Sequence, residues 1–344
     1  MESGHFFNLG TLKPQTVCPG GTRTTVTRKE VAALDGISLA RLSLQKGTIQ
    51  EPLWHPNAHK VGYCLEGSLL VTLLGQGVRE TFTVEAGDIF FVPKGYFHLL
   101  ANRSDQLTSI VFALSNHQPD QLSLVEAIRS LSPSAFSATF HTPPQLFDAL
   151  TASTQESLIT SCGTKAIPAA QTSRFKFGVD RSSSVVQVEG GYLRAATKTN
   201  LPVLQDLGIL TFGLNEKGIV EPHWHTNAGE LIYIVKGKTR ISILSPHGEH
   251  TVAEVDAGGG AFAPASHFHS IENIGPEPVE VIAFFSAADP DYVGAGQAMS
   301  ACSPEVLSSI FNLPLEQFRD FTPPMGPVVI ASSVTHPERA YAYR

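Results

Sequence analysis

Hydrophobic and polar residues alternate in several segments of the chain, most clearly at 68–74 and 240–244. Such alternation predicts β-strands that bury one face. Glycine and proline interrupt the hydrophobic runs about every 8–12 residues, a spacing typical of an antiparallel sandwich or barrel. The middle of each half of the chain is therefore predicted to be β-structure.

Short helices are predicted after each run of strands. Segments 123–131 and 295–301 have the composition of short helices, and a Ser-Pro pair follows each of them. Serine is a favoured N-cap and proline suits the first helical position. Ser132 and Ser303 are therefore predicted to cap a second helix in each half.

The two halves are copies of one unit. Matching residues lie 170 positions apart in the first part of the unit and 171 apart in the second, so one residue is inserted between them. The matches include Gly20 with Gly190, Leu44 with Leu214, Pro93 with Pro264, His98 with His269 and Asn102 with Asn273. This register holds over more than a hundred residues, which indicates an internal repeat. We predict two β-barrels, each followed by a small helical group.

The repeat sets the predicted domain boundaries. We expect an N-terminal domain at 5–150, a polar linker at 151–174, a C-terminal domain at 175–325 and a tail at 326–344. The residues from Pro323 onward are predicted to have no counterpart in the first copy.

The composition excludes several classes of protein. The chain has 344 residues, 42% of them hydrophobic, which is ample for a core. A net charge of −7 and the lack of basic runs argue against binding to nucleic acid or to an anionic membrane. The longest apolar stretches fall far short of the roughly 18 residues that a membrane span needs. The first ten residues lack the pattern of a signal peptide, so a cytoplasmic location is expected.

Candidate metal ligands gather in the second copy. His223 and His225 are two residues apart on a predicted strand and so share a face. Glu230 begins the next apolar run, and His269 lies at the start of a later strand. Three imidazoles and one carboxylate suit a divalent ion such as Mn, Fe, Ni, Co or Zn. On an octahedral ion these four ligands leave two positions for a substrate or O₂.

The first copy has lost part of this set. Leu53 replaces the first histidine and Lys60 replaces the glutamate, whereas His55 and His98 remain. A lysine at this point disfavours the binding of a cation. The first copy is expected to be metal-free, either as a purely structural barrel or with a small anion near His55, His98 and Lys60.

These spacings resemble the two sequence motifs of the cupins. The residues that carry the resemblance are His223, His225, Glu230 and Gly237 in the first motif, and Gly258, Pro264, His269 and Asn273 in the second. The duplicated form is similar to the bicupins, which include oxalate decarboxylases and seed storage globulins, and which belong with the germins. The resemblance implies a fold dominated by β-structure, with two jelly-roll barrels and short helices after each. It also implies one divalent metal per chain, with Mn as the first choice.

Two features differ from the oxalate decarboxylase pattern. That family places an arginine three residues before the first ligand histidine, where this chain has Val220, and Gln50 in the first copy. The family also carries a glutamate in a lid after the last barrel strand. The matching segment 286–296 contains Asp289 and Asp291 instead. Either aspartate is a candidate lid acid, because a positioned carboxylate can transfer a proton to a bound substrate. The alternative is that both belong to an exposed turn.

Three functions remain open at this point. The first is an enzyme of the oxalate decarboxylase type that acts on a small carboxylate at one metal site in the second copy. The second is a metal-dependent dioxygenase for a larger phenolic or diketone substrate, which Val220, Tyr233 and Phe262 fit. The third is a non-catalytic, storage-like or ligand-binding bicupin. A small-molecule partner is expected in each enzyme case, with O₂ in the second, and a homo-oligomer is compatible with all three.

Overall fold

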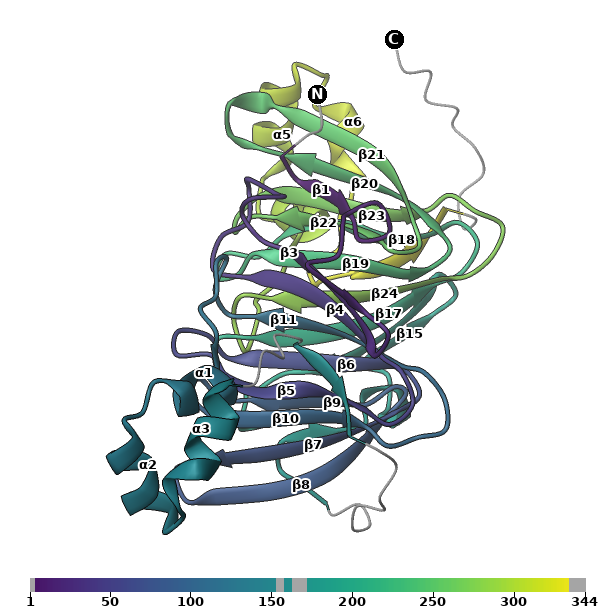
Figure 1. Cartoon of the computed structure of the whole chain (residues 1–344). Coiled ribbons are helices and arrows are strands. Elements are labelled where there is room, and N and C mark those ends of the chain that lie inside the picture. Colours follow the sequence, from purple (N-terminus) through teal and green to yellow (C-terminus); the bar gives the residue numbers. More distant parts are fainter. Residues whose placement is uncertain (1–3, 153–157, 163–171, 334–344) are drawn as a thin grey trace.

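The computed structural model describes residues 4–152, 158–162 and 172–333. It contains two β-barrels stacked on each other, with a helical group beside each (Figure 1). Each barrel is built from one seven-stranded and one six-stranded sheet. The prediction of two jelly-roll barrels with short helices after each is confirmed.

The sheets of the first barrel combine strands that are distant in sequence. The seven-stranded sheet has the order β14 (Lys176–Phe177), β9 (Ile89–Val92), β6 (Lys60–Glu66), β11 (Thr108–Leu114), β4 (Ser38–Leu44), β3 (Gly21–Val26) and β2 (Thr16–Cys18). The six-stranded sheet has the order β12 (Leu122–Ser123), β5 (Thr48–Trp54), β10 (Phe97–Asn102), β7 (Ser68–Gly75) and β8 (Val78–Glu85), with β13 (Ile159–Ser161) paired to β5.

The second barrel repeats this arrangement. Its seven-stranded sheet has the order β1 (Phe6–Asn8), β22 (Gly259–Ala263), β19 (Glu230–Lys236), β24 (Val279–Phe285), β17 (Gly208–Leu214), β16 (Gly191–Ala196) and β15 (Val186–Val188). Its six-stranded sheet has the order β21 (His250–Asp256), β20 (Lys238–Leu244), β23 (Phe268–Asn273), β18 (Gly218–Trp224) and β25 (Val293–Gly294), with β26 (Ile330–Ser332) paired to β18.

The helices follow the barrels as the sequence predicts. Those after the first barrel are α1 (Leu124–Arg129), α2 (Pro133–Phe140) and α3 (Pro144–Ala152), and those after the second are α4 (Ala295–Ser300), α5 (Pro304–Phe311) and α6 (Glu316–Arg319). Two 3₁₀ turns, η1 (Val179–Arg181) and η2 (Pro246–Gly248), complete the helical elements. The hydroxyl groups of Ser132 and Ser303 cap α2 and α5 by accepting backbone N–H groups, as expected. No helix in the described ranges is long and apolar enough to cross a membrane.

The opening strand of each copy lies in the other copy's barrel. Strand β1 pairs with β22, and β14 pairs with β9. In Figure 1, β1 accordingly lies with the upper barrel although it begins the chain. The repeat boundaries near residues 5 and 175 therefore mark sequence units, while the folded barrels exchange these first strands.

The segment after Pro323 does have a counterpart in the first copy. Strand β26 pairs with β18 just as β13 pairs with β5, with Ile330 opposite Val220 and Ile159 opposite Gln50. The prediction that this tail is unmatched is wrong, because a three-residue edge strand carries too weak a pattern to be detected. The rest of the tail (334–344) and most of the predicted linker lie outside the described residues.

Strand β19 is buried on both faces. Ile232 and Ile234 belong to the core of the second barrel. Leu231 and Tyr233 belong instead to a cluster that also contains residues of the first barrel. The sequence predicts one buried face here, and the second is buried because the two barrels pack together. Because side chains alternate along a strand, Glu230 shares the interior face with Ile232.

A buried carboxylate joins the start of the second copy to the first barrel by pairing with two partly exposed cations. Asp88, which is fully buried, accepts the Lys176 ammonium at 2.8 Å and also contacts the guanidinium of Arg181. Lys176 lies on β14 and Arg181 in η1. The pair therefore fixes the exchanged segment on its partner barrel.

Replacing Asp88 tests this anchor. We expect Asp88→Asn to lower the free energy of unfolding by about 3 kcal/mol, because two cations lose their buried counter-charge. The exposed pair of Asp105 with Lys46 provides the control, and Asp105→Asn should leave the unfolding midpoint unchanged. Urea denaturation followed by tryptophan fluorescence measures both, and equal midpoints for the two variants would contradict the anchor.

Candidate metal centre

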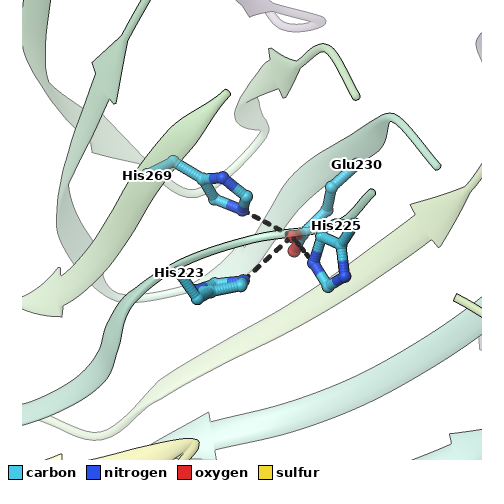
Figure 2. A group of neighbouring side chains, drawn as sticks. All are labelled: His223, His225, Glu230 and His269. Carbon is cyan, nitrogen blue, oxygen red and sulfur yellow. Dashed lines mark hydrogen bonds and ion pairs between the residues drawn. The ribbon is translucent and has the colours of Figure 1, made fainter. Parts of the chain in front are cut away.

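Three strands from the two sheets of the second barrel position the predicted ligands. His223 on β18 and His269 on β23 are direct cross-strand partners. Glu230 is the first residue of β19, and His225 follows the end of β18. Figure 2 shows the four side chains pointing toward one another in the interior of the second barrel. The structure thus brings together all four residues that the sequence selects.

The geometry of the group is compact. The Nε2 atoms of His269, His225 and His223 lie 2.8, 3.1 and 3.6 Å from Oε2 of Glu230. One potential ligand atom from each of the four residues lies within 4.8 Å of all the others. All four residues are at most 4% exposed. The result is a buried set of three nitrogens and one carboxylate.

Each imidazole is held by its other nitrogen. The Nδ1 atoms contact backbone carbonyl oxygens, which only accept hydrogen bonds: His223 on Glu221 at 2.7 Å, His269 on His267 at 2.8 Å, and His225 on Asp291. In a neutral imidazole the proton then sits on Nδ1, and Nε2 presents a lone pair. With all three imidazoles neutral, three lone pairs and a carboxylate oxygen would face one another, an arrangement that a cation between them relieves.

These donors fit a divalent transition metal. Imidazole nitrogen and carboxylate oxygen are common ligands of such ions. Ligating histidines almost always donate their other N–H to a carbonyl or carboxylate, as all three do here. The assignment of the four residues to a metal is a prediction that their geometry supports.

The ionisation states follow from burial and from the charges within the group. Burial, together with the neighbouring His269, lowers the pKa of His223 to about 4. Burial alone would raise the pKa of Glu230, but its contacts with the imidazoles hold it well below its ordinary value. His223 is therefore neutral and Glu230 ionised at neutral pH, which are the forms that bind metals.

Glu221 and Tyr292 support the group from behind. The Tyr292 ring stacks on His223 with 4.5 Å between ring centroids, and its hydroxyl donates to Oε1 of Glu221 at 3.2 Å. The same Oε1 accepts the backbone N–H groups of Val328 and Val329. Sequence reasoning missed both residues. The Glu-Pro pair shared by the two copies was a signal for Glu221, whereas the position of Tyr292 depends on a loop conformation.

The predicted lid acids hold the loop that follows β24. Both oxygens of the Asp291 carboxylate accept hydrogen bonds from Thr226, and Asp289 accepts the backbone N–H of Lys198 at 3.0 Å. Burial would raise the pKa of Asp291, but the Thr226 hydrogen bonds outweigh it and lower the pKa. Neither carboxylate is part of the four-residue group. The role of lid acid stays a prediction for both.

The aromatic residues assigned to a larger substrate lie elsewhere. Tyr233 and Phe262 pack in the cluster between the barrels, because they alternate with the inward residues of their strands. That assignment is wrong. Val220 and Phe285 do belong to the second barrel's core, and Phe285 lies 4.9 Å from the His225 ring. The Phe285 ring is therefore an apolar neighbour of the centre.

The corresponding region of the first barrel has a different arrangement. Nζ of Lys60 lies 2.6 Å from Nε2 of His98, where Glu230 approaches His269 in the second barrel. Leu53 is buried in the position of His223. Within the described ranges, His223, His225, Glu230 and His269 are the one group of three or more histidine, cysteine or acidic residues close enough to share an ion.

Comparison with known proteins gives a consistent family and fold. The cupin family model matches residues 7–144 and again 177–319. An oxalate decarboxylase of Bacillus subtilis is 22% identical over 77% of this chain and 71% of its own length. A vicilin-like seed storage protein of Arabidopsis thaliana is 27% identical over 45% of this chain and 33% of its own. A solved structure of the B. subtilis enzyme, from a study of its Mn(II) centres, has a TM-score of 0.86 at 20% identity and covers 96% of this chain and 89% of that one. At this identity the structural match shows the fold alone.

Replacing, in turn, the histidines at one position of the repeat, His225 and His55, tests the assignment of a single metal site. We expect His225→Ala to lower the bound metal from about one equivalent to less than a tenth, because a buried ligand is lost. His55→Ala, the matched change in the first barrel, should leave the metal content unchanged. Plasma mass spectrometry after metal loading and dialysis measures both. Equal losses in the two variants would rule out a single site.

Removing the Tyr292 ring tests the support behind His223. We expect Tyr292→Leu to weaken metal binding about tenfold, the usual effect of losing an outer contact to a ligand. Tyr292→Phe keeps the stacked ring and should weaken binding less. Competition with a chelator of known affinity gives the dissociation constants. Affinities equal to that of the unmodified chain in both variants would show that the ring does not support the site.

Proposed function

This chain belongs to the cupin family, as a protein with two cupin domains, and we propose that it is a metal-dependent decarboxylase acting on a small carboxylate at one metal centre in its second barrel. The observation that carries this proposal is the convergence of three imidazole Nε2 atoms on the Glu230 carboxylate. The decarboxylase of B. subtilis that matches across both domains supports the type of reaction.

Manganese is the metal we propose for the centre. His223, His225, His269 and Glu230 would hold the ion, and this donor set accepts Mn as well as Fe, Ni, Co or Zn. The match to an enzyme studied for its Mn(II) centres supports Mn as the first choice. When bound, such an ion supplies Lewis-acid or redox chemistry toward a coordinated carboxylate.

The residues of the chain itself would orient the ligands and exclude water. The carbonyl contacts to Nδ1 fix the three ring orientations, and the stacked Tyr292 restrains His223. The burial of all four ligands keeps bulk water away, which strengthens electrostatic interactions at the centre.

Decarboxylation leaves a carbanion that must take up a proton, and Asp289 and Asp291 are the proposed donors. Each carboxylate now accepts hydrogen bonds from neighbouring residues. To act as an acid, either carboxylate must release these bonds and first take up a proton from solvent, which requires the loop after β24 to move. The loop is coupled to the centre through the contact between the Asp291 carbonyl and His225.

The apolar side chain of Val220 favours a substrate with one carboxylate. The resemblance to oxalate decarboxylases implies an arginine at the position of Val220, which would pair with a second carboxylate. Val220 is buried in the apolar core and offers no such partner. We therefore propose a substrate whose remaining part is uncharged, rather than oxalate.

The other two functions receive less support. The dioxygenase hypothesis used Tyr233 and Phe262, and both side chains pack between the barrels. The seed storage protein matches less than half of this chain, whereas the decarboxylase matches across both domains. The cytoplasmic location and a homo-oligomer stay predictions.

Gas measurements on the manganese-loaded protein test the reaction. The panel consists of oxalate, pyruvate and lactate, and both the CO₂ released and the O₂ consumed are recorded. We expect CO₂ release from a monocarboxylate, with an O₂ uptake below about a tenth of the CO₂ released. In His225→Ala the rate of CO₂ release should fall at least about 100-fold. His250→Ala, a change at an exposed histidine, is the control and should leave the rate unchanged. O₂ uptake equal to CO₂ release would indicate a dioxygenase, and no CO₂ from any substrate would contradict the enzyme.

A further inference from the structure

The interior of the first barrel contains basic and polar side chains where the second barrel has its metal centre and apolar walls. The buried residues that share this interior are Arg23, Gln50, His55, Lys60 and His98, and each is at most 9% exposed. Three of them differ in character from their partners in the repeat. Arg23, Gln50 and Lys60 correspond to Leu193, Val220 and Glu230, so the first barrel has gained basic and amide groups.

Two of these groups are cations that share one aromatic neighbour. Nζ of Lys60 lies 4.6 Å from the centre of the Phe112 ring, and Cζ of Arg23 lies 5.8 Å from it. Strands β3, β6 and β11 supply the three residues from one sheet. On the opposite sheet, His98 contacts Nζ of Lys60 at 2.6 Å. The two positive side chains are therefore neighbours inside the barrel.

The cationic forms of these groups have no matching carboxylate in this interior. Burial, followed by the charge of Arg23, lowers the pKa of Lys60 well below its ordinary value. Burial and the charge of Lys60 lower the pKa of His55 to about 3, and act in the same direction on His98. No acidic side chain is among the groups that shift these pKa values. Buried charge of one sign is costly unless it is compensated.

Several polar atoms of these inward-facing residues have no hydrogen-bond partner. Both amide atoms of Gln50, Nε2 of His55 and Nε of Arg23 are buried and unpaired in the described part of the chain. Most buried polar atoms in native proteins are hydrogen-bonded. His55 is oriented by its other nitrogen, which contacts the Asp120 carbonyl at 2.7 Å. That contact leaves a lone pair on Nε2 of His55, so the unpaired donors are Nε2 of Gln50 and Nε of Arg23. A bound anion would satisfy these two donors.

We propose that the first barrel binds a small carboxylate anion through Arg23, Gln50 and Lys60. Its negative charge compensates the Lys60 ammonium and the Arg23 guanidinium, and one of its oxygens accepts an N–H of Gln50. The site uses no metal and lies in the other barrel from the proposed catalytic centre. It therefore does not depend on the proposed function.

Titration calorimetry on the metal-free full-length chain tests the site. Chelator treatment prevents the second barrel from binding the same ligands through a metal. The probes are formate, acetate, glycolate and oxalate, with chloride as the control anion. We expect one equivalent of at least one carboxylate to bind at concentrations below about 10 mM. Binding should also take up protons, because a nearby anion raises the pKa of Lys60, and His55, His98 and Arg23 face the same space.

Substitutions taken from the second barrel locate the site. We expect Gln50→Val and Arg23→Leu to fold, since the other barrel carries these residues, and each to weaken binding by about tenfold or more. Lys94→Met, at an exposed lysine, should leave the affinity unchanged. The absence of carboxylate binding to the unmodified chain would overturn the proposal. So would affinities of Gln50→Val and Arg23→Leu that both equal the affinity of the unmodified chain. Neither result would affect the proposed decarboxylase, because no metal or turnover is involved.

Discussion

Charge enclosed within a closed β-barrel requires compensation inside that barrel, because water is excluded and the surroundings are apolar. The second barrel encloses three imidazole groups and the ionised Glu230 carboxylate. Together these groups form a set of ligands that would bind a cation. The first barrel encloses Lys60 and Arg23, which call for an anion. The two barrels have the same strand order, but one interior contains an acidic group and the other contains basic groups. The sign of the ligand that each barrel accepts follows from this difference.

Strand register determines which few side chains give each interior its charge. His223 lies opposite His269 in the second barrel, and Leu53 lies opposite His98 in the first. The side chains of β19 that point out of the second barrel pack between the two barrels. The interior is therefore lined by the side chains that point inward. With the backbone fixed in this way, the change from Glu230 to Lys60 replaces a proposed metal ligand with a basic side chain at the same position of the repeat.

Sequence reasoning succeeded where the signal was long or local. The repeat kept its register over more than a hundred residues, and the caps at Ser132 and Ser303 follow rules within one helical turn. The four proposed ligands were selected because spacing on strands determines which face a side chain takes. The exchange of β1 and β14, the strand β26 and the stacking of Tyr292 depend on contacts between distant segments. No local pattern encodes such contacts.

The composition of the first interior argues against a barrel that merely supports its twin. Leu193 and Val220 show that this fold packs apolar residues at the positions of Arg23 and Gln50. Buried polar groups without partners destabilise a fold relative to apolar residues of similar size. A barrel with only a structural role would therefore be more stable with the residues of the second copy. A ligand that satisfies Arg23, Gln50 and Lys60 removes this penalty, because it supplies both the missing charge and the missing hydrogen-bond acceptors.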